Sequence, residues 1–397
     1  MMKKSIFAVA VASALTLGAA QAETVLYGSI RYDYQNIKQE TVDTVVDAND
    51  KYNFSGKSLS NLEDAGSRIG IKGSEDLGNN NAVIYNLEWG FNGMDSEASG
   101  FKNRKAILGL TGDWGTFTAG RQDNPFKVTI VDDTVADDFN GSDTKSTAVQ
   151  RAMSATLNGV GLVGTKQADG KFTATLDQAT EFAGNNKPNI TDADYSRVGK
   201  VIAYTTPDFA GFQANVALMM DKNLYGVVNK EKNIDLWTIN AKYAYDLGAN
   251  GQILAKAGYI QGKTADNNKS KVWGLYLGYL SDQFNVTASY ADGNHKPVTG
   301  AGAPSGAKQK SKGWDLGASF AFGPNNFSSI RAAYGENQLK VDGEKDKVKS
   351  WAVGFEQKLS TRTRAWVEYG QEETKFAADN LGKKKDNAIS IGMRHDF

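Results

Sequence analysis

An alternation of apolar and polar residues with a period of two constrains this chain most, because it recurs from Thr24 to the last residue. Residues 236–245 show it clearly. One set of alternate positions holds Trp237, Ile239, Ala241, Tyr243 and Tyr245, and the other holds Leu236, Thr238, Asn240 and Lys242. Segments 272–279, 284–290, 314–322 and 351–358 repeat the pattern. Since successive side chains of a strand point to opposite faces, the sequence predicts an all-β protein.

Aromatic residues stand at both ends of the apolar faces, as Trp237 and Tyr245 do. A soluble sandwich has no need of this placement, whereas a transmembrane barrel carries aromatic girdles on both sides of an apolar band about 25 Å tall. The interleaved polar residues would then face a wet lumen, and we expect this of Asn240, Lys242, Asp315, Arg331 and Glu356. No stretch after residue 22 approaches 18 consecutive apolar residues, so strands rather than helices are expected to cross the membrane.

Connections of two lengths alternate along the chain. The short ones carry Gly, Pro, Asn and Asp, as turns do, and lie at 76–79, 111–115, 207–211, 246–250, 281–282, 323–326 and 360–362. The long polar ones lie at 38–65, 92–101, 122–196, 222–233, 262–270, 293–311, 337–348 and 373–386. These connections predict a sixteen-stranded antiparallel barrel, closed by pairing of strand 24–37 with strand 387–397. Eighteen strands would result if Met153–Leu157 and Lys171–Leu176 also crossed the membrane.

The first 22 residues have the pattern of a secretory signal peptide. Lys3 and Lys4 precede an apolar run, and Ala20-Gln21-Ala22 forms an A-x-A cleavage site. We expect export through the Sec route and a single barrel domain over 23–397. Loss of two lysines from a chain with 45 basic and 45 acidic residues leaves a net charge of −2.

Composition removes several kinds of chemistry. The chain has no cysteine and two histidines, His295 and His395, which leaves little for thiol, zinc or triad catalysis. Balanced charge argues against nucleic acid as a partner. We therefore expect no enzyme activity, no cofactor and no structural metal.

Several segments together resemble the general diffusion porins of Gram-negative outer membranes. They are Leu26–Gly28, Ser67–Gly73, Glu75–Gly78, Leu87–Gly90, Asn103–Leu110, Gly115–Arg121, Arg197–Gly199, Pro207–Phe212 and Ile391–Phe397. The likeness covers the mature chain in order and looks closest to the major porins of marine and related gammaproteobacteria. The terminal Phe397 is similar to the family's outer-membrane assembly signal, although His395 stands where an aromatic residue is more usual.

The resemblance implies a homotrimer in which the third outer loop, here 122–196, folds inward and narrows each pore. It further implies a constriction with basic residues on the barrel wall, for which the candidates are Arg31, Arg68, Arg104, Arg121 and Arg197. The acidic candidates on the loop are Asp123, Asp132, Asp133, Asp137 and Asp138. The family's Pro-Glu-Phe type motif is absent, since Asn124-Pro125-Phe126 has no acid between proline and phenylalanine. The side on which Arg121 lies is left open.

These features together predict a bacterial outer-membrane channel for passive diffusion of small hydrophilic solutes and ions. Two alternatives stay open: a substrate-specific sugar porin, and a surface adhesin or receptor barrel that acts through its long loops. The expected partners are two further copies of the chain, outer-membrane lipids and lipopolysaccharide, and the assembly machinery that reads the C-terminal strand. Net charge does not predict ion selectivity, because selectivity depends on the charges beside the pore.

Overall fold

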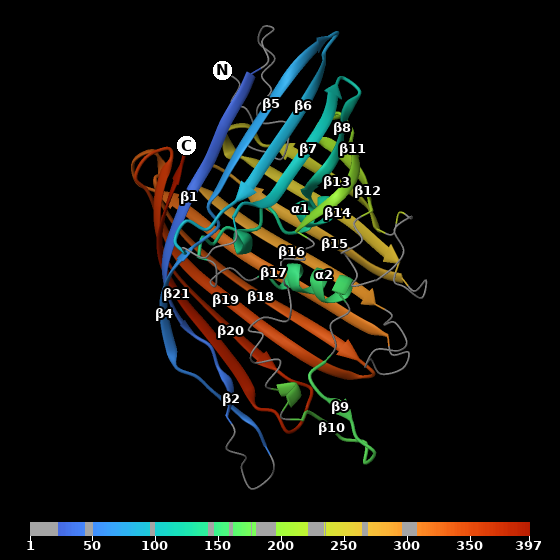
Figure 1. Cartoon of the computed structure of the whole chain (residues 1–397), viewed down its shortest axis with the longest axis vertical. Coiled ribbons are helices and arrows are strands. Elements are labelled where there is room, and N and C mark those ends of the chain that lie inside the picture. The colour runs from blue at the N-terminus through green and yellow to red at the C-terminus, as the bar shows by residue number, and fades with distance from the viewer. Residues whose placement is uncertain are drawn as a thin grey trace.

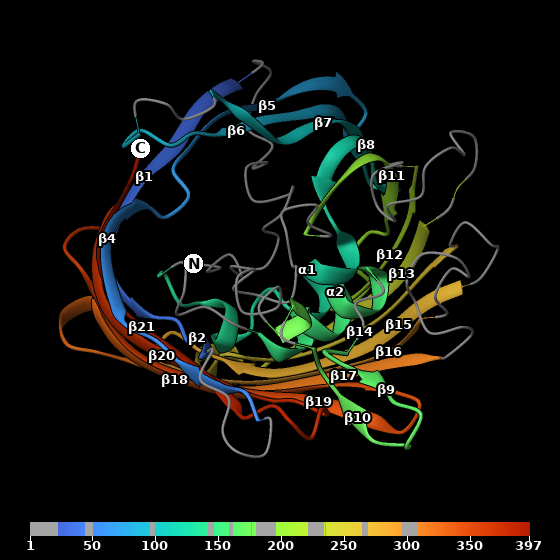
Figure 2. The ribbon, with the colours of Figure 1, turned by 60° about the horizontal axis from the view of Figure 1, so that its bottom comes forward.

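The computed structural model describes residues 23–43, 51–95, 100–141, 147–158, 162–175, 177–179, 196–220, 234, 236–263, 269–295 and 308–397. The expected signal peptide, residues 1–22, lies outside the described residues. Figure 1 shows the described chain as a wall of long tilted strands, and Figure 2 shows that this wall closes into a ring.

The ring consists of antiparallel strands that follow one another in chain order. β4 and β5 count as one interrupted strand, because both pair with the same edge of β1, β5 along 23–29 and β4 along 32–38. With this pair counted once, sixteen strands close the ring. The strands are β1 (Glu23–Lys38), β4 (Ser58–Asp64), β5 (Arg68–Gly78), β6 (Asn81–Gly90), β7 (Lys102–Gly112), β8 (Gly115–Asp123), β11 (Arg197–Thr205), β12 (Phe212–Met219), β13 (Leu236–Asp246), β14 (Gln252–Lys263), β15 (Lys269–Leu280), β16 (Phe284–His295), β17 (Gln309–Phe322), β18 (Ser328–Val341), β19 (Glu344–Lys358), β20 (Thr363–Lys375) and β21 (Lys383–Asp396).

The predicted pairing of the first and last strands is confirmed. β1 and β21 run antiparallel from the pair Ser29 and Asp396 to the pair Lys38 and Asn387. The terminal residue extends the ladder, since the Phe397 and Gly28 amides each donate to the other's carbonyl oxygen at 3.1 Å. The sheet therefore has no open edge at the junction of the chain's two ends.

The seven predicted short turns are confirmed at one end of the barrel, but two predicted long loops are wrong in part. β4 occupies 58–64 of the predicted loop 38–65. Residues 337–348 mostly belong to β18 and β19, which pair as far as Val341 and Glu344. Asp342 and Gly343 alone form the turn, with φ of 49° and 94°, as a two-residue hairpin turn requires. Polar composition suggested a loop here, yet a strand that extends beyond the bilayer is just as polar.

The two faces of the wall differ as the alternation predicts. Large apolar side chains are exposed on the outward face, among them Leu275, Leu316 and Ile330. Thr238, Asn240 and Asp315 are buried on the inward face. None of the helices in the described ranges has the length and apolar composition needed to cross a membrane.

In its described residues, the segment after β8 adds no strand to the barrel. It contains α1 (Pro125–Ile130), the short 3-10 helix η1 (Val135–Asp137) and α2 (Ala148–Asn158). Met153–Leu157 lies in α2, and the hairpin of β9 (Thr165–Lys166) and β10 (Phe172–Thr173) pairs only with itself. The eighteen-stranded alternative is therefore wrong.

A second small hairpin, β2 (Thr41–Asp43) with β3 (Asn53–Ser55), belongs to the first outer connection. The 3-10 helices η3 (Gly248–Asn250) and η4 (Pro324–Asn326) lie in turns.

The closure predicts a severe effect of a side chain at Gly28. A Cβ there would lie 2.6 Å from the Arg68 carbonyl oxygen and would also collide with the Phe397 ring. We expect Gly28→Val to block closure, so that the heat-modifiable form of the folded barrel is lost on a gel. Gly100→Val is the matched control, because a Cβ at Gly100 meets nothing within 4 Å. Normal folding of Gly28→Val would contradict the assignment of this contact to closure.

Candidate functional site

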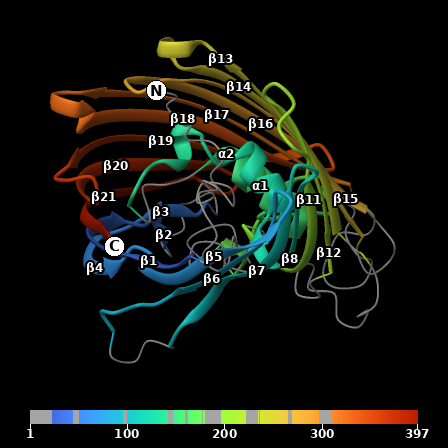
Figure 3. The same ribbon diagram turned by 90° about the horizontal axis from the view of Figure 1, so that it is seen from above.

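α1, η1 and α2 lie within the ring of strands, against the wall from β13 to β19 (Figures 2 and 3). Glycines on the inward face make room for them. A Cβ at Gly258 would lie 2.9 Å from the Phe126 ring, and one at Gly274 would lie 2.8 Å from Ile130. A Cβ at Gly317 would likewise lie 2.7 Å from Val135. The wall strands thus accept a folded segment that larger side chains would exclude.

An apolar core lies between this segment and the wall. Phe126, Ile130 and Met153 are fully buried in it, together with wall residues such as Val201 and Ile260. The expectation of a uniformly wet inward face is therefore wrong on this side. Asn240, Asp315 and Glu356 do point inward, but they are also buried. The alternation shows which residues point inward, but does not reveal what covers them.

Two buried wall carboxylates hold the segment by its backbone. Asp315 on β17 accepts the Ala148 and Val149 amides, at 2.9 and 2.8 Å, at the start of α2. Glu368 on β20 accepts the Asn140 amide at 2.9 Å and the Gly141 amide at 2.8 Å. Hydrogen bonds to charged acceptors contribute about 1.5–3 kcal/mol each. Both carboxylates therefore act as anchors for the segment.

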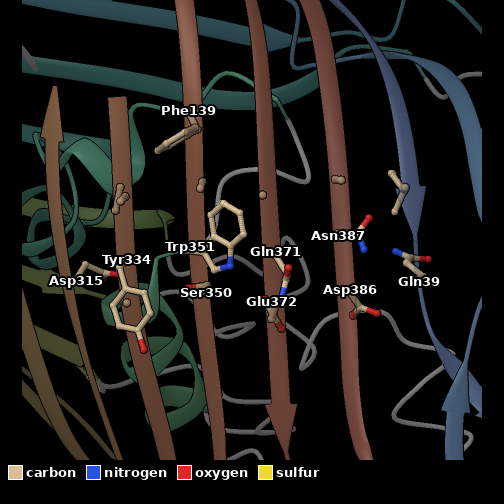
Figure 4. Close-up of a pocket in the computed structure, with 17 residues that line it drawn as sticks. Gln39, Phe139, Asp315, Tyr334, Ser350, Trp351, Gln371, Glu372, Asp386 and Asn387 are labelled. Atoms are coloured by element: carbon tan, nitrogen blue, oxygen red, sulfur yellow. The ribbon is translucent and has the colours of Figure 1, made fainter. Parts of the chain in front are cut away.

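A recess lies beside these anchors, where β17 to β21 meet the segment (Figure 4). Phe139 reaches over it from the segment, and Asp315, Glu372 and Asp386 contribute carboxylates from the wall. Each carboxylate has a partner: Asp315 binds the α2 amides, Glu372 pairs with Arg151, and Asp386 pairs with Lys384 at 2.8 Å. The recess belongs to the anchoring of the segment, and its carboxylates are not free to act as an acid and base pair.

Three of the acidic residues predicted on the loop, Asp132, Asp133 and Asp137, are held by two lysines that the sequence interpretation missed. Lys127 in α1 pairs with Asp132 and, at 3.8 Å, with Asp137. Burial alone would lower the pKa of Lys127, but the carboxylates of Asp137 and Asp132 outweigh burial and raise it. Lys256 on β14 pairs with Asp133 at 2.6 Å. The carbonyl oxygen of Asp138 accepts a hydrogen bond from Arg331 on β18.

Arg68 and Arg104 are brought together by Glu88, which the sequence interpretation also missed. Glu88 on β6 is buried and lies 2.6 Å from Arg104 Nε and 3.9 Å from Arg68 Nε. Tyr27 donates to the same carboxylate at 3.1 Å. A register shift in the β6–β7 ladder leaves Arg104 as an extra residue between Asn103 and Lys105. Such a bulge re-aims a side chain, and here it lets both Arg104 and Lys105 reach inward carboxylates.

Asp123 and Arg197 also come together, at the end of β8. Asp123 lies 2.6 Å from Lys105 Nζ and 3.6 Å from Arg197 Nε. Asp123 thus belongs to the wall cluster rather than to the row on the folded segment. Arg121 lies apart, because it donates to the Asn103 carbonyl oxygen and pairs in register with Ala106 on the outward face.

Arg31 belongs to a row of arginines across three neighbouring strands. Its register partner on β21 is Arg394, whose partner on β20 is Arg364. Asp396 pairs with Arg394 at 2.6 Å and with Arg364 at 3.6 Å. Within the described ranges Arg31 Nε is buried without a hydrogen-bond partner. The row places more positive than negative charge on this part of the wall.

The sequence did contain a signal for the functional residues that its interpretation missed. Glu88, Lys256, Arg364 and Arg394 all occupy inward positions of regular strands, where a charge requires either a partner or water. The partners could not be read from spacing, because they depend on the register between neighbouring strands or, for Lys256, on the folded segment. Among the described residues, no group of three or more His, Asp or Glu side chains could hold a metal ion.

Comparison with known proteins agrees with this architecture. Residues 8–377 match the family model described as "Gram-negative porin". An outer membrane porin protein of Bordetella pertussis is 26% identical over 439 residues that cover all of both chains. The solved anion-selective porin from Comamonas acidovorans has a TM-score of 0.65 at 21% identity, covering 95% of this chain and 100% of that one. The trimer form of OmpT of Vibrio cholerae has a TM-score of 0.60 at 13% identity, covering 95% and 99%.

The closed sixteen-stranded ring, its apolar outward face and its charged inward face are those of a channel rather than an enzyme. The family match covers most of the chain. This chain belongs to the Gram-negative porin family and forms an outer-membrane channel for the passive diffusion of solutes.

Proposed function

We propose that the segment 124–158 and the arginine-bearing wall form the constriction of this channel. The observation that carries the proposal is the placement of charge in the ring. The segment holds Asp132, Asp133, Asp137 and Asp138 within the barrel, and β14 anchors it through Lys256. The arginines of β1, β5, β7, β20 and β21 lie on the other part of the ring.

Ring order supports an opposed arrangement. β14 and β15 hold Asp133, through Lys256 and through the Tyr276 hydroxyl, which donates to the Asp133 carbonyl oxygen at 3.0 Å. β1 and β5, which carry Arg31 and Arg68, lie half a turn away along the order of strands. Opposed rows of fixed charge set up a transverse field across water, which orients dipolar solutes and disfavours apolar ones.

A general diffusion channel fits the lumen better than a sugar-specific one. Sugar recognition needs a series of aromatic rings free to stack along the path. Among the described residues, the large inward aromatic side chains of the barrel strands are otherwise engaged. Tyr27 donates to Glu88 at 3.1 Å, Tyr276 binds Asp133, and Trp366 is buried and donates to the Ser390 hydroxyl at 2.9 Å. An adhesin role would depend on outer loops, and no contact in the described residues favours it.

We further propose how the chain is exported and assembled. Residues 1–22 serve as a Sec signal peptide, 23–397 form the mature domain, and Phe397 is the C-terminal signal that the assembly machinery reads. Three copies associate, as the trimer form of OmpT does. Conductance in a planar bilayer should then appear in groups of three steps, and solitary steps throughout would contradict the trimer.

Removal of the wall arginines should change ion preference. In Arg68→Gln with Arg104→Gln, two fixed positive charges that repel cations are lost, so the reversal potential in a salt gradient should move toward cation preference. Arg121→Gln is the matched control, since Arg121 shares the outward face with Ala106. An unchanged reversal potential in the double variant would remove these arginines from the constriction.

Neutralising Glu88, the carboxylate between Arg68 and Arg104, should shift the ion preference in the opposite direction. Glu88→Gln keeps the shape of the side chain but leaves Arg68 and Arg104 without their shared counter-charge. We expect its reversal potential to move toward anion preference. A purely structural disturbance would move both variants the same way, so the opposite signs distinguish an electrostatic role.

Loss of the backbone anchors should widen the pore. In Asp315→Ala with Glu368→Ala, the amides of Ala148, Val149, Asn140 and Gly141 lose their charged acceptors. The lost hydrogen bonds are worth about 1.5–3 kcal/mol each, so the segment should leave the wall and raise single-channel conductance and its noise. Glu336→Ala is a control, because Glu336 is a carboxylate on the outward face. Wild-type conductance in the double variant would show that the segment does not narrow the pore.

A further inference from the structure

Lysines gather on the outward face of β17 to β20, next to the outer hairpin of β18 and β19. Their positions alternate with inward residues and share the parity of the exposed Trp314, Tyr334 and Trp351. We call this set the outer lysine cluster, and it comprises Lys310, Lys312, Lys340, Lys345, Lys347 and Lys375. It lies on the lipid side of the wall and is separate from the proposed constriction.

The aromatic girdle fixes the height of the cluster. Trp314 packs against Tyr334 with ring centroids 5.5 Å apart, and Trp351 against Tyr369 at 5.2 Å. Lys312 and Lys310 follow Trp314 outward by two and four residues, or about 7 and 14 Å along a strand. Aromatic girdles mark the interface between lipid and water. The cluster therefore lies at the level of the headgroups of the extracellular leaflet.

Register places like charges side by side in this cluster. Lys310 pairs with Lys340, and Lys340 pairs with Lys345 on the next strand. Lys347 pairs with Lys375 in a second row. Like charges directly opposite each other destabilise a ladder. Among the described residues, no carboxylate oxygen lies within 4 Å of these six ammonium groups to offset the repulsion.

The next row of outward residues toward the membrane differs, because it contains carboxylates. One row closer to the membrane, Lys349 pairs with Glu336 at 3.5 Å, and Glu373 pairs with Lys383 at 2.9 Å. At the opposite end of the same strands, the outward residues are aromatic, namely Phe320, Phe322 and Phe355. On the described residues of β17 to β20, the outward lysines without a carboxylate partner thus lie at one end of the barrel.

The geometry points to a binding site for the phosphate groups of the glycolipid in the extracellular leaflet, the lipid A part of lipopolysaccharide. Phosphates at headgroup height would supply the counter-charge that the two rows lack. Lysine suits this role because its alkyl chain lies along apolar surface while the ammonium reaches the polar layer. The glycolipid would seal the barrel wall at the outer hairpin of β18 and β19.

Native mass spectrometry of the intact channel in nonionic detergent tests the site, with bisphosphorylated lipid A as the probe. The variant Lys310→Gln, Lys340→Gln, Lys345→Gln should bind lipid A at least ~10-fold more weakly than the unaltered protein, because three attractive charges are lost. The matched control removes three exposed lysines away from the outward wall, as Lys57→Gln, Lys166→Gln, Lys171→Gln. It should retain the affinity of the unaltered protein.

Two further measurements separate phosphate recognition from general lipid binding. Dephosphorylated lipid A should bind the unaltered protein and the triple variant equally weakly, and added salt should weaken binding of the phosphorylated form. Equal retention of bisphosphorylated lipid A by the triple variant and the unaltered protein would overturn the proposal, as would equal binding of both lipid forms. Single-channel conductance should be unchanged, because the substituted residues face lipid. If the triple variant does not assemble, Lys340→Gln alone provides the same comparison.

Discussion

Backbone hydrogen bonding in a medium without water is the constraint on which this structure depends. Every strand that crosses the bilayer needs a partner on both sides, so the sheet must close. The closure is made by β1 and β21, and Phe397 and Gly28 complete it. Once the ring is closed, the two faces of each strand have different surroundings, and the period of two in the sequence becomes a division between lipid and lumen.

The lumen is shaped by what the inward face accepts. Gly258, Gly274 and Gly317 leave space on the wall, and the segment after β8 fills it with Phe126, Ile130 and Val135. Asp315 and Glu368 then bind the backbone of that segment. The barrel is therefore an asymmetric channel. One side is lined by a packed, anchored segment, and the other is lined by arginines with a smaller number of carboxylates.

Charge has a different role in each place where it gathers. Glu88 joins Arg68 and Arg104 beside the proposed constriction, and Lys256 fixes an aspartate of the folded segment. The outer lysine cluster lies on the opposite face of the wall, where like charges are neighbours. The balance of 45 basic and 45 acidic residues in the whole chain conceals this separation.

The sequence by itself determined the all-β fold, the pairing of the chain's two ends and the inward face of Asn240, Asp315 and Glu356, because the alternation is a local property of extended chain. Tertiary structure alone decided the apolar core within the barrel, the strand extension over 337–348, the anchors Asp315 and Glu368, and the place of Glu88 between two arginines. The core and the anchors depend on residues that lie far apart in the chain and meet only when the ring closes and the segment folds against its wall. The hairpin of β18 and β19 and the place of Glu88 depend instead on the register of neighbouring strands.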